Sequence, residues 1–156
     1  MPKLALNKPI PDFKLPATGE KSIKLSELKG NNLVLYFYPK DNTSGCTLEA
    51  RVFNTNRAKF KRLNTIILGV SRDSLKSHDS FRKKLRLKFD LLSDEKAKVC
   101  RLFGVIKLKN MYGHRYQGIE RSTFLIDATG VLRHEWRKVS VSGHVDEVLK
   151  VLKTLL

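Results

Sequence analysis

Continuous apolar runs and helical spacing of apolar residues alternate along the first half of this chain. Residues 33–38 and 65–70 are apolar runs with the length and the β-branched or aromatic content of strands that are covered on both faces. Between them, residues 46–61 contain neither Gly nor Pro, and Ala50 and Phe53 fall near one helical face. Strand, helix and strand in this order predict a right-handed parallel βαβ unit.

The pattern on either side of this unit predicts further short elements. Residues 12–25 alternate apolar and polar positions about a turn-rich segment, which is typical of a hairpin. After the βαβ unit, the spacing of apolar residues indicates a charged amphipathic helix, a short strand and a second helix, at residues 74–85, 89–92 and 95–103.

The last third of the chain gives a hairpin and a helix. Residues 123–126 and 131–136 are β-prone, and the turn residues between them favour an antiparallel pair. Apolar residues then repeat at three and four positions, at Val145, Val148, Leu149 and Leu152. Residues 105–118, by contrast, have no pattern that distinguishes helix from strand.

These elements together predict an α/β fold with a central mixed β-sheet flanked by helices and an N-terminal β-hairpin. A chain of 156 residues falls within the usual size of one domain, so we expect residues 1–156 to form a single one. No apolar run is long enough to span a membrane. The first residues lack the apolar core of a secretion signal, which predicts a cytoplasmic location.

The charge is strongly positive. The chain has 31 Lys and Arg against 15 Asp and Glu, a formal net charge of +16, which attracts nucleic acid, acidic partners or anionic substrates. The basic residues are spread from Lys3 to Lys153, however, and only residues 82–88 are dense in them. A generally basic solvated surface explains this spread better than a dedicated groove, so we expect no specific nucleic-acid site.

Two cysteines, Cys46 and Cys100, are too few and too far apart for a disulfide framework or a zinc site. The four histidines lie singly, so no metal site is expected. Cys46 follows a polar loop after a buried strand, where a helix is predicted to begin. Free backbone N–H groups at a helix start favour a thiolate, and Thr43 lies three residues earlier. The residues alone fit a reactive thiolate and a small buried side chain equally well.

A resemblance to a known family favours the thiolate. Residues 37–50 resemble the active-site signature of peroxiredoxins, Pro-x-x-x-Thr-x-x-Cys, in the form of the bacterioferritin comigratory protein or Q-type subfamily. Residues 91–94, 118–127 and 136–149 are similar to later parts of the same subfamily, so the resemblance covers nearly the whole chain. It implies a thioredoxin-like fold, which agrees with the order of the predicted elements.

The resemblance also implies roles for individual residues. Cys46 matches the peroxidatic cysteine, Thr43 a hydroxyl that contacts thiolate and peroxide, and Pro39 a residue that shields the pocket. Arg121 matches an arginine beside the thiolate, and Glu49 an acidic residue that orients an arginine. A guanidinium stays charged and polarises the peroxide as charge moves onto the leaving oxygen.

The implied activity is a thiol-dependent peroxidase that reduces hydrogen peroxide and organic hydroperoxides. The thiolate attacks one peroxide oxygen, water or an alcohol leaves, and Cys46 becomes a sulfenic acid. The reaction requires no metal, haem, flavin or other cofactor. The subfamily is usually monomeric, which implies a monomer here.

The chain departs from the family pattern in how the sulfenic acid is resolved. Many members carry a resolving cysteine five residues after the peroxidatic one, and Arg51 occupies that position here. Cys100 shares a predicted helical face with Ala97 and Phe103, which favours a packed structural thiol. We therefore expect a one-cysteine enzyme reduced by thioredoxin, glutaredoxin or a small thiol. The alternatives are a two-cysteine enzyme in which Cys100 resolves, and a basic thioredoxin-fold binding protein without this activity.

Overall fold

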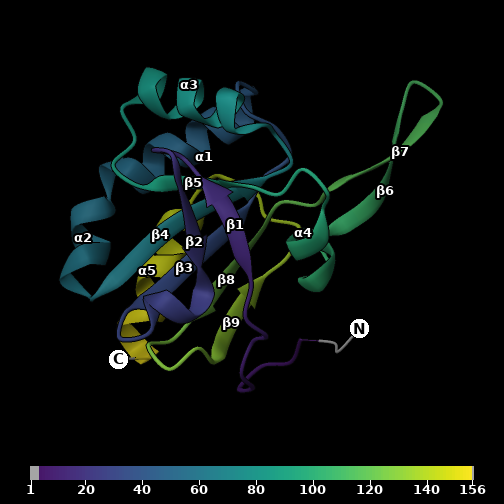
Figure 1. The fold of residues 1–156 in the computed structure, drawn as a ribbon. Helices are drawn as coiled ribbons and strands as arrows, with labels where there is room; N and C mark the ends of the chain where they lie inside the picture. Colours follow the sequence, from purple (N-terminus) through teal and green to yellow (C-terminus); the bar gives the residue numbers. More distant parts are fainter. Residues whose placement is uncertain (1–3, 156) are drawn as a thin grey trace.

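A seven-stranded mixed sheet forms the centre of the molecule (Figure 1). The computed structural model describes residues 4–155; residues 1–3 and 156, the ends of the predicted domain, lie outside the described part. The strands of this sheet are β1 (Lys14–Ala17), β2 (Lys21–Lys24), β3 (Asn32–Phe37), β4 (Thr65–Ser71), β5 (Asp90–Ser93), β8 (Ser122–Ile126) and β9 (Leu132–Trp136). They lie in the order β2-β1-β5-β4-β3-β8-β9, so the predicted N-terminal hairpin forms one edge of the sheet.

Helices cover the sheet on both sides. They are α1 (Ser44–Thr55), α2 (Arg57–Arg62), α3 (Leu75–Leu85), α4 (Lys98–Leu102), α5 (His144–Leu155) and the 3₁₀ helix η1 (Leu25–Leu28). Successive side chains of a strand point to opposite faces, and every residue of β3 is buried. Alternate β3 residues therefore belong to two separate cores. One core holds side chains of α1, α2, α3 and α5, and the other holds side chains of α4 and η1.

The predicted βαβ unit is present, because β3 and β4 pair in parallel and the chain between them is helical. The single helix predicted over residues 46–61 is wrong in one respect, since it divides at Asn56 into α1 and α2. The Asn56 side chain donates to the carbonyl of Val52 at 2.8 Å, one turn earlier. Asparagine side chains compete with the backbone for such bonds, and this weakens a continuous helix.

The residues without a readable pattern form a second, two-stranded sheet. Strands β6 (Ile106–Met111) and β7 (His114–Ile119) pair antiparallel and project from the body of the molecule (Figure 1). We call residues 106–119 the β6–β7 arm. Most of its side chains are exposed, so it lacks the one-sided burial that produces alternation. Its turn consists of Tyr112 and Gly113, both with positive φ (52° and 82°), as two-residue hairpin turns require.

The other helices follow the sequence with one adjustment. Helix α3 begins as predicted, with the Ser74 hydroxyl accepting the N–H of Ser77 at 3.2 Å. Helix α4 is shorter than the predicted residues 95–103, because Ala97 adopts a left-handed conformation (φ 56°) that delays the helix start. Among the described residues, no helix has both the length and the apolar character to cross a membrane.

Candidate active site

The loop after β3 carries Cys46 into the first turn of α1. Thr43 is the residue before the helix, with extended backbone (φ −86°, ψ 154°), and its carbonyl accepts the N–H of Thr47 at 2.9 Å. Cys46 is only 1% exposed and packs in the core on the α1 side of the sheet. The N–H groups of a first helical turn have no partner within the helix and form its positive end. Cys46 therefore lies at the helix start that the sequence predicts.

Arg121 joins Cys46 to Glu49. Its Nη2 donates to the Cys46 sulfur at 3.4 Å, and its Nη1 donates to Glu49 Oε1 at 2.7 Å. Arg121 comes from the connection between β7 and β8, whereas Glu49 lies one turn after Cys46 on α1. A Cβ atom on Gly45 would lie 3.1 Å from Arg121 Nη2. A side chain at Gly45 would therefore press on the guanidinium that donates to the sulfur.

Burial and neighbouring charges shift the pKa values of Glu49 and Arg121 in opposite directions. Burial raises the pKa of Glu49 to about 7, although the neighbouring Arg121 lowers it. Burial lowers the pKa of Arg121, but the carboxylate of Glu49 and the sulfur of Cys46 outweigh it, so the pKa of Arg121 is raised overall. Arg121 is consequently a permanent cation. A cation beside sulfur stabilises the thiolate over the thiol.

The remaining predicted residues lie beside this group. The Thr43 hydroxyl donates to the carbonyl of Lys40 at 2.8 Å, and within residues 4–155 it makes no hydrogen bond to Cys46. Pro39 and Thr43 line a groove of about 540 Å³ between the loop and the β6–β7 arm. The structure therefore joins Cys46, Glu49 and Arg121 directly, and it places Pro39 and Thr43 in a groove that none of these three residues lines.

Cys100 lies apart from this group, in α4. It is 0% exposed and belongs to the core with Leu35 and Phe37, whereas Cys46 belongs to the core with Val34 and Tyr36. These pairs of β3 residues alternate along the strand, so the central sheet separates the two cysteines. Burial, followed by the charge of Asp94, raises the pKa of the Cys100 thiol far above its usual value.

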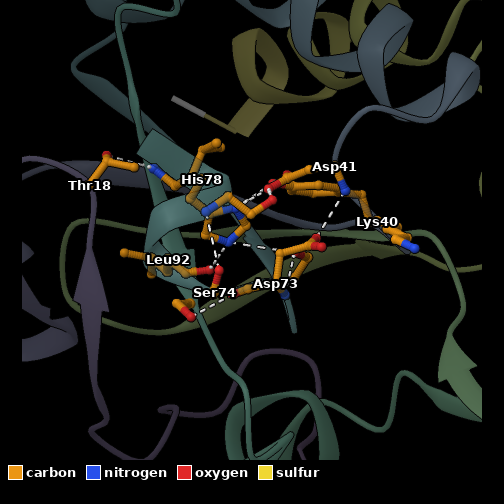
Figure 2. A network of polar contacts seen from close by, with 12 residues as sticks. Thr18, Lys40, Asp41, Asp73, Ser74, His78 and Leu92 are labelled. Atoms are coloured by element: carbon orange, nitrogen blue, oxygen red, sulfur yellow. Dashed lines mark hydrogen bonds and ion pairs between the residues drawn. The ribbon is translucent and has the colours of Figure 1, made fainter. Parts of the chain in front are cut away.

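A buried polar network anchors the loop that leads to Cys46, and sequence reasoning missed it. Figure 2 shows the His78 ring between Asp41 of the loop and the main chain of Leu92. His78 Nδ1 lies 2.7 Å from Asp41 Oδ2, and Nε2 lies 2.9 Å from the Leu92 carbonyl oxygen. A carbonyl only accepts, so Nε2 carries a proton. The Tyr38 hydroxyl donates to the second oxygen of Asp41 at 2.6 Å.

Asp73 completes this network by accepting the backbone N–H of Asp41 at 2.9 Å (Figure 2). The ligand atoms of Asp41, Asp73 and His78 lie within 4.8 Å of one another, but hydrogen bonds within the chain already engage them. Asp41 lies in the loop after β3, Asp73 in the loop between β4 and α3, and His78 on α3, so tertiary folding brings Asp41 to the other two. Their joint effect is to fix the loop to the body of the protein.

Comparison with known proteins identifies the family. The model of the AhpC/TSA family matches residues 6–135. The chain belongs to the AhpC/TSA family. It is 49% identical over 145 residues to "Peroxiredoxin Bcp" of Bacillus subtilis, a match that covers 93% of this chain and 92% of that protein. The chain is therefore a peroxiredoxin, a thiol-dependent peroxidase, as its resemblance implied.

Solved structures of peroxiredoxins confirm the thioredoxin-like fold. The bacterioferritin comigratory protein of Xanthomonas campestris, studied for its alkyl peroxide reduction activity, is 48% identical, with a TM-score of 0.87 over 91% of this chain and 90% of that one. PrxQ of Xylella fastidiosa is 44% identical, with a TM-score of 0.92 over 99% and 98% of the two chains. The predicted mixed sheet with an N-terminal hairpin is thus confirmed.

Proposed function

We propose that this peroxiredoxin is a one-cysteine enzyme in which Cys46 reduces the peroxide and an external thiol regenerates it. The observation that carries the proposal is the contact of 3.4 Å between Arg121 Nη2 and the Cys46 sulfur, in a chain whose other thiol lies across the sheet. Hydrogen peroxide and organic hydroperoxides are the substrates.

The first half-reaction uses the groups around the sulfur. The Cys46 thiolate attacks the nearer peroxide oxygen, the O–O bond breaks, and the other oxygen leaves and takes up a proton as water or an alcohol. Arg121 faces the charge as it moves from sulfur to oxygen, and a preformed donor there lowers the barrier. The Thr43 hydroxyl donates its hydrogen bond to the Lys40 carbonyl. Its oxygen is therefore available to accept a hydrogen bond from the peroxide O–H.

Glu49 and Pro39 support this arrangement. The short bond of 2.7 Å from Arg121 to Glu49 fixes the guanidinium plane, while its other terminal nitrogen remains directed at the sulfur. Pro39 lines the groove next to the loop without offering an N–H that would compete for the peroxide. Both residues act by positioning and shielding the reacting atoms.

The second half-reaction needs a thiol from outside the chain. A thiolate attacks the sulfenic acid of Cys46, water leaves, and a second thiol reduces the mixed disulfide. Cys100 is unsuited to the first step, because burial and Asp94 raise its pKa and disfavour the thiolate. Thioredoxin, glutaredoxin or a small thiol therefore supplies the electrons. In this proposal the enzyme is a monomer and works in the cytoplasm.

Peroxide consumption by wild type, Cys46→Ser and Cys100→Ser tests this proposal. Each protein is supplied in turn with a thioredoxin system and with a monothiol, and with hydrogen peroxide or an organic hydroperoxide. We expect turnover to disappear only in Cys46→Ser. If Cys100→Ser also stops turnover with thioredoxin but not with the monothiol, Cys100 is the resolving cysteine and the one-cysteine mechanism is wrong.

A further inference from the structure

The β6–β7 arm gathers most of the large apolar side chains that the described part of the molecule exposes. Leu108, Met111, Tyr112 and Tyr116 are 66%, 56%, 97% and 43% exposed. Only Leu6 and Leu48 are comparable elsewhere among residues 4–155. The β6–β7 register places Met111 and Tyr116 on one face of the arm with Lys107 and Lys109, whereas Leu108 lies on the opposite face and Tyr112 is at the tip. Single exposed apolar residues are common, but the apolar group on the first face and the tip marks an interaction surface.

This arm extends to the proposed reaction site. Met111 and Tyr116 line the same groove as Pro39 and Thr43 of the Cys46 loop. The chain leaves β7 at Ile119 and reaches Arg121 two residues later, so the base of the arm is continuous with the guanidinium at the sulfur. A protein held on this face of the arm would consequently lie beside the groove that Pro39 and Thr43 of the Cys46 loop line.

The charge of the arm selects the kind of partner. Its only charged side chains are Lys107, Lys109 and Arg115, all basic, and none of them forms an ion pair with the described acidic residues. Uncompensated charge at the edge of an apolar patch steers a partner of opposite charge and fixes its orientation. The complementary surface is an apolar patch with an acidic rim.

We propose that the β6–β7 arm is the docking surface for an acidic protein reductant with a reactive dithiol. This inference rests on the proposed one-cysteine mechanism, which requires electrons from outside the chain. One thiolate of the docked partner attacks the Cys46 sulfenic acid, an S–S bond forms, and the S–O bond breaks with loss of water. The partner's second thiol then attacks the partner sulfur of this bond, which releases Cys46 as a thiolate and leaves a disulfide in the partner.

Two variants test this face without touching the groove. Tyr112→Asn removes an apolar contact at the tip, and asparagine tolerates the positive φ of residue 112. Lys107→Glu reverses a charge on the face. The matched controls are Leu108→Ser and Arg115→Glu, which change an exposed apolar and an exposed basic residue on the opposite face of the arm.

The readout is peroxidase turnover with bacterial thioredoxin, its reductase and NADPH, compared with turnover on dithiothreitol. We expect Tyr112→Asn and Lys107→Glu each to lose about tenfold or more in the rate constant for thioredoxin, the usual effect of removing central interface residues. The rate with dithiothreitol should stay within about twofold, and both controls should match wild type. Added salt should slow wild type with thioredoxin and affect Lys107→Glu less.

The outcomes separate this inference from the mechanism on which it rests. An unchanged thioredoxin rate in both Tyr112→Asn and Lys107→Glu overturns the docking surface, and so does an equal loss with thioredoxin and dithiothreitol. If wild type accepts electrons from dithiothreitol but not from thioredoxin, the docking proposal fails while the one-cysteine mechanism stands. If neither reductant supports turnover, the mechanism itself fails. A wild-type dimer that Tyr112→Asn converts to monomer, with the thioredoxin rate unchanged, assigns the arm to a second copy of this chain.

Discussion

The two cysteines of this chain are equally buried but have opposite surroundings. Cys46 is 1% exposed and Cys100 is 0% exposed, so burial alone does not distinguish them. Cys46 lies 3.4 Å from a guanidinium nitrogen at the start of a helix of twelve residues. Cys100 lies beside Asp94, whose carboxylate accepts the Cys100 backbone N–H at 2.7 Å. A positive neighbour favours a thiolate and a negative neighbour opposes one.

The difference between the surroundings of Cys46 and Cys100 comes from the topology of the sheet as much as from the charged residues beside each sulfur. Each cysteine belongs to its own core, and strand β3 contributes alternate side chains to both. A groove lined by Pro39 and Thr43 lies beside the loop that leads to Cys46, whereas Cys100 is enclosed between α4 and the sheet. The same residue type thus serves as a candidate nucleophile on one face and as packing on the other.

Removing the positive neighbour should have the largest effect. We expect Arg121→Met to lower kcat/KM for peroxide by about 10² to 10³, the usual cost of removing one preformed donor from a site where charge develops. The alkylation rate of Cys46 should fall as well, because the sulfur loses the cation that faces it in wild type. Arg133→Met is a matched control, since Arg133 pairs with Asp127 at 3.2 Å away from the sulfur. Peroxidase activity of Arg121→Met equal to that of the control would remove Arg121 from the mechanism.

Releasing the loop that leads to Cys46 should come next. His78→Asn removes one hydrogen-bond partner of the buried Asp41 carboxylate, at 2.7 Å, and leaving a buried charged group short of a partner costs about 3 kcal/mol of unfolding free energy. Peroxidase activity should fall about tenfold at temperatures where the variant is folded, because the loop also carries Thr43 and Pro39. Urea denaturation and steady-state kinetics on the same sample measure both effects. Unchanged stability would contradict the anchoring role of this network.

Glu49→Gln should have an effect on activity similar to that of His78→Asn and a characteristic pH dependence. We expect about a tenfold loss of kcat/KM, because the variant replaces the charge-assisted bond that orients Arg121 with a weaker one. Burial raises the pKa of Glu49 from 4.5 to about 7, so folding favours its protonated form. That contribution to stability is present below pH 4.5 and is lost as the pH rises through about 7.

The stability of Glu49→Gln relative to wild type should therefore increase between pH 4.5 and pH 8. Urea unfolding of both proteins at several pH values measures this difference. A constant difference across the range would mean that the carboxyl group of Glu49 titrates alike in the folded and unfolded chains.

Changing the second cysteine should have the smallest effect on catalysis. We expect Cys100→Ala to keep kcat/KM within about twofold of wild type with either a protein or a small-thiol reductant. The unfolding free energy should fall by about 1 to 2 kcal/mol, because a buried sulfur atom leaves a small void. Thermal unfolding and peroxide turnover together separate a packing role from a redox role. A selective loss with the protein reductant would contradict the packing role.

Sequence patterns predicted those parts of the fold that depend mainly on burial or on local turn chemistry. The buried strand at residues 33–38 and the helix that begins near Cys46 follow from burial and from local turn chemistry. The β6–β7 arm was not predicted, because strands exposed on both faces lack alternation; the pair Tyr112-Gly113 was the available signal. The break at Asn56 depends on one side-chain bond, which helical periodicity does not register.

The residues of the site likewise divide into those that the local sequence indicates and those that only tertiary contacts bring together. Cys46 stood out from its place between a buried strand and a helix, but on residues alone it fitted packing equally well. Arg121 came only from the family resemblance, because 75 residues separate it from Cys46 and tertiary folding brings them together. The Asp41 and His78 pair joins two elements 37 residues apart, and no spacing rule relates them. Long-range contacts of this kind require the structure.

The most direct test of the one-cysteine account is to locate the oxidised sulfur. Wild-type protein treated with one equivalent of hydrogen peroxide, without reductant and with dimedone present, is digested and analysed by mass spectrometry after blocking of the free thiols. The account predicts a single dimedone adduct on Cys46 and a free thiol on Cys100. A disulfide between Cys46 and Cys100, or an adduct on Cys100, would contradict it.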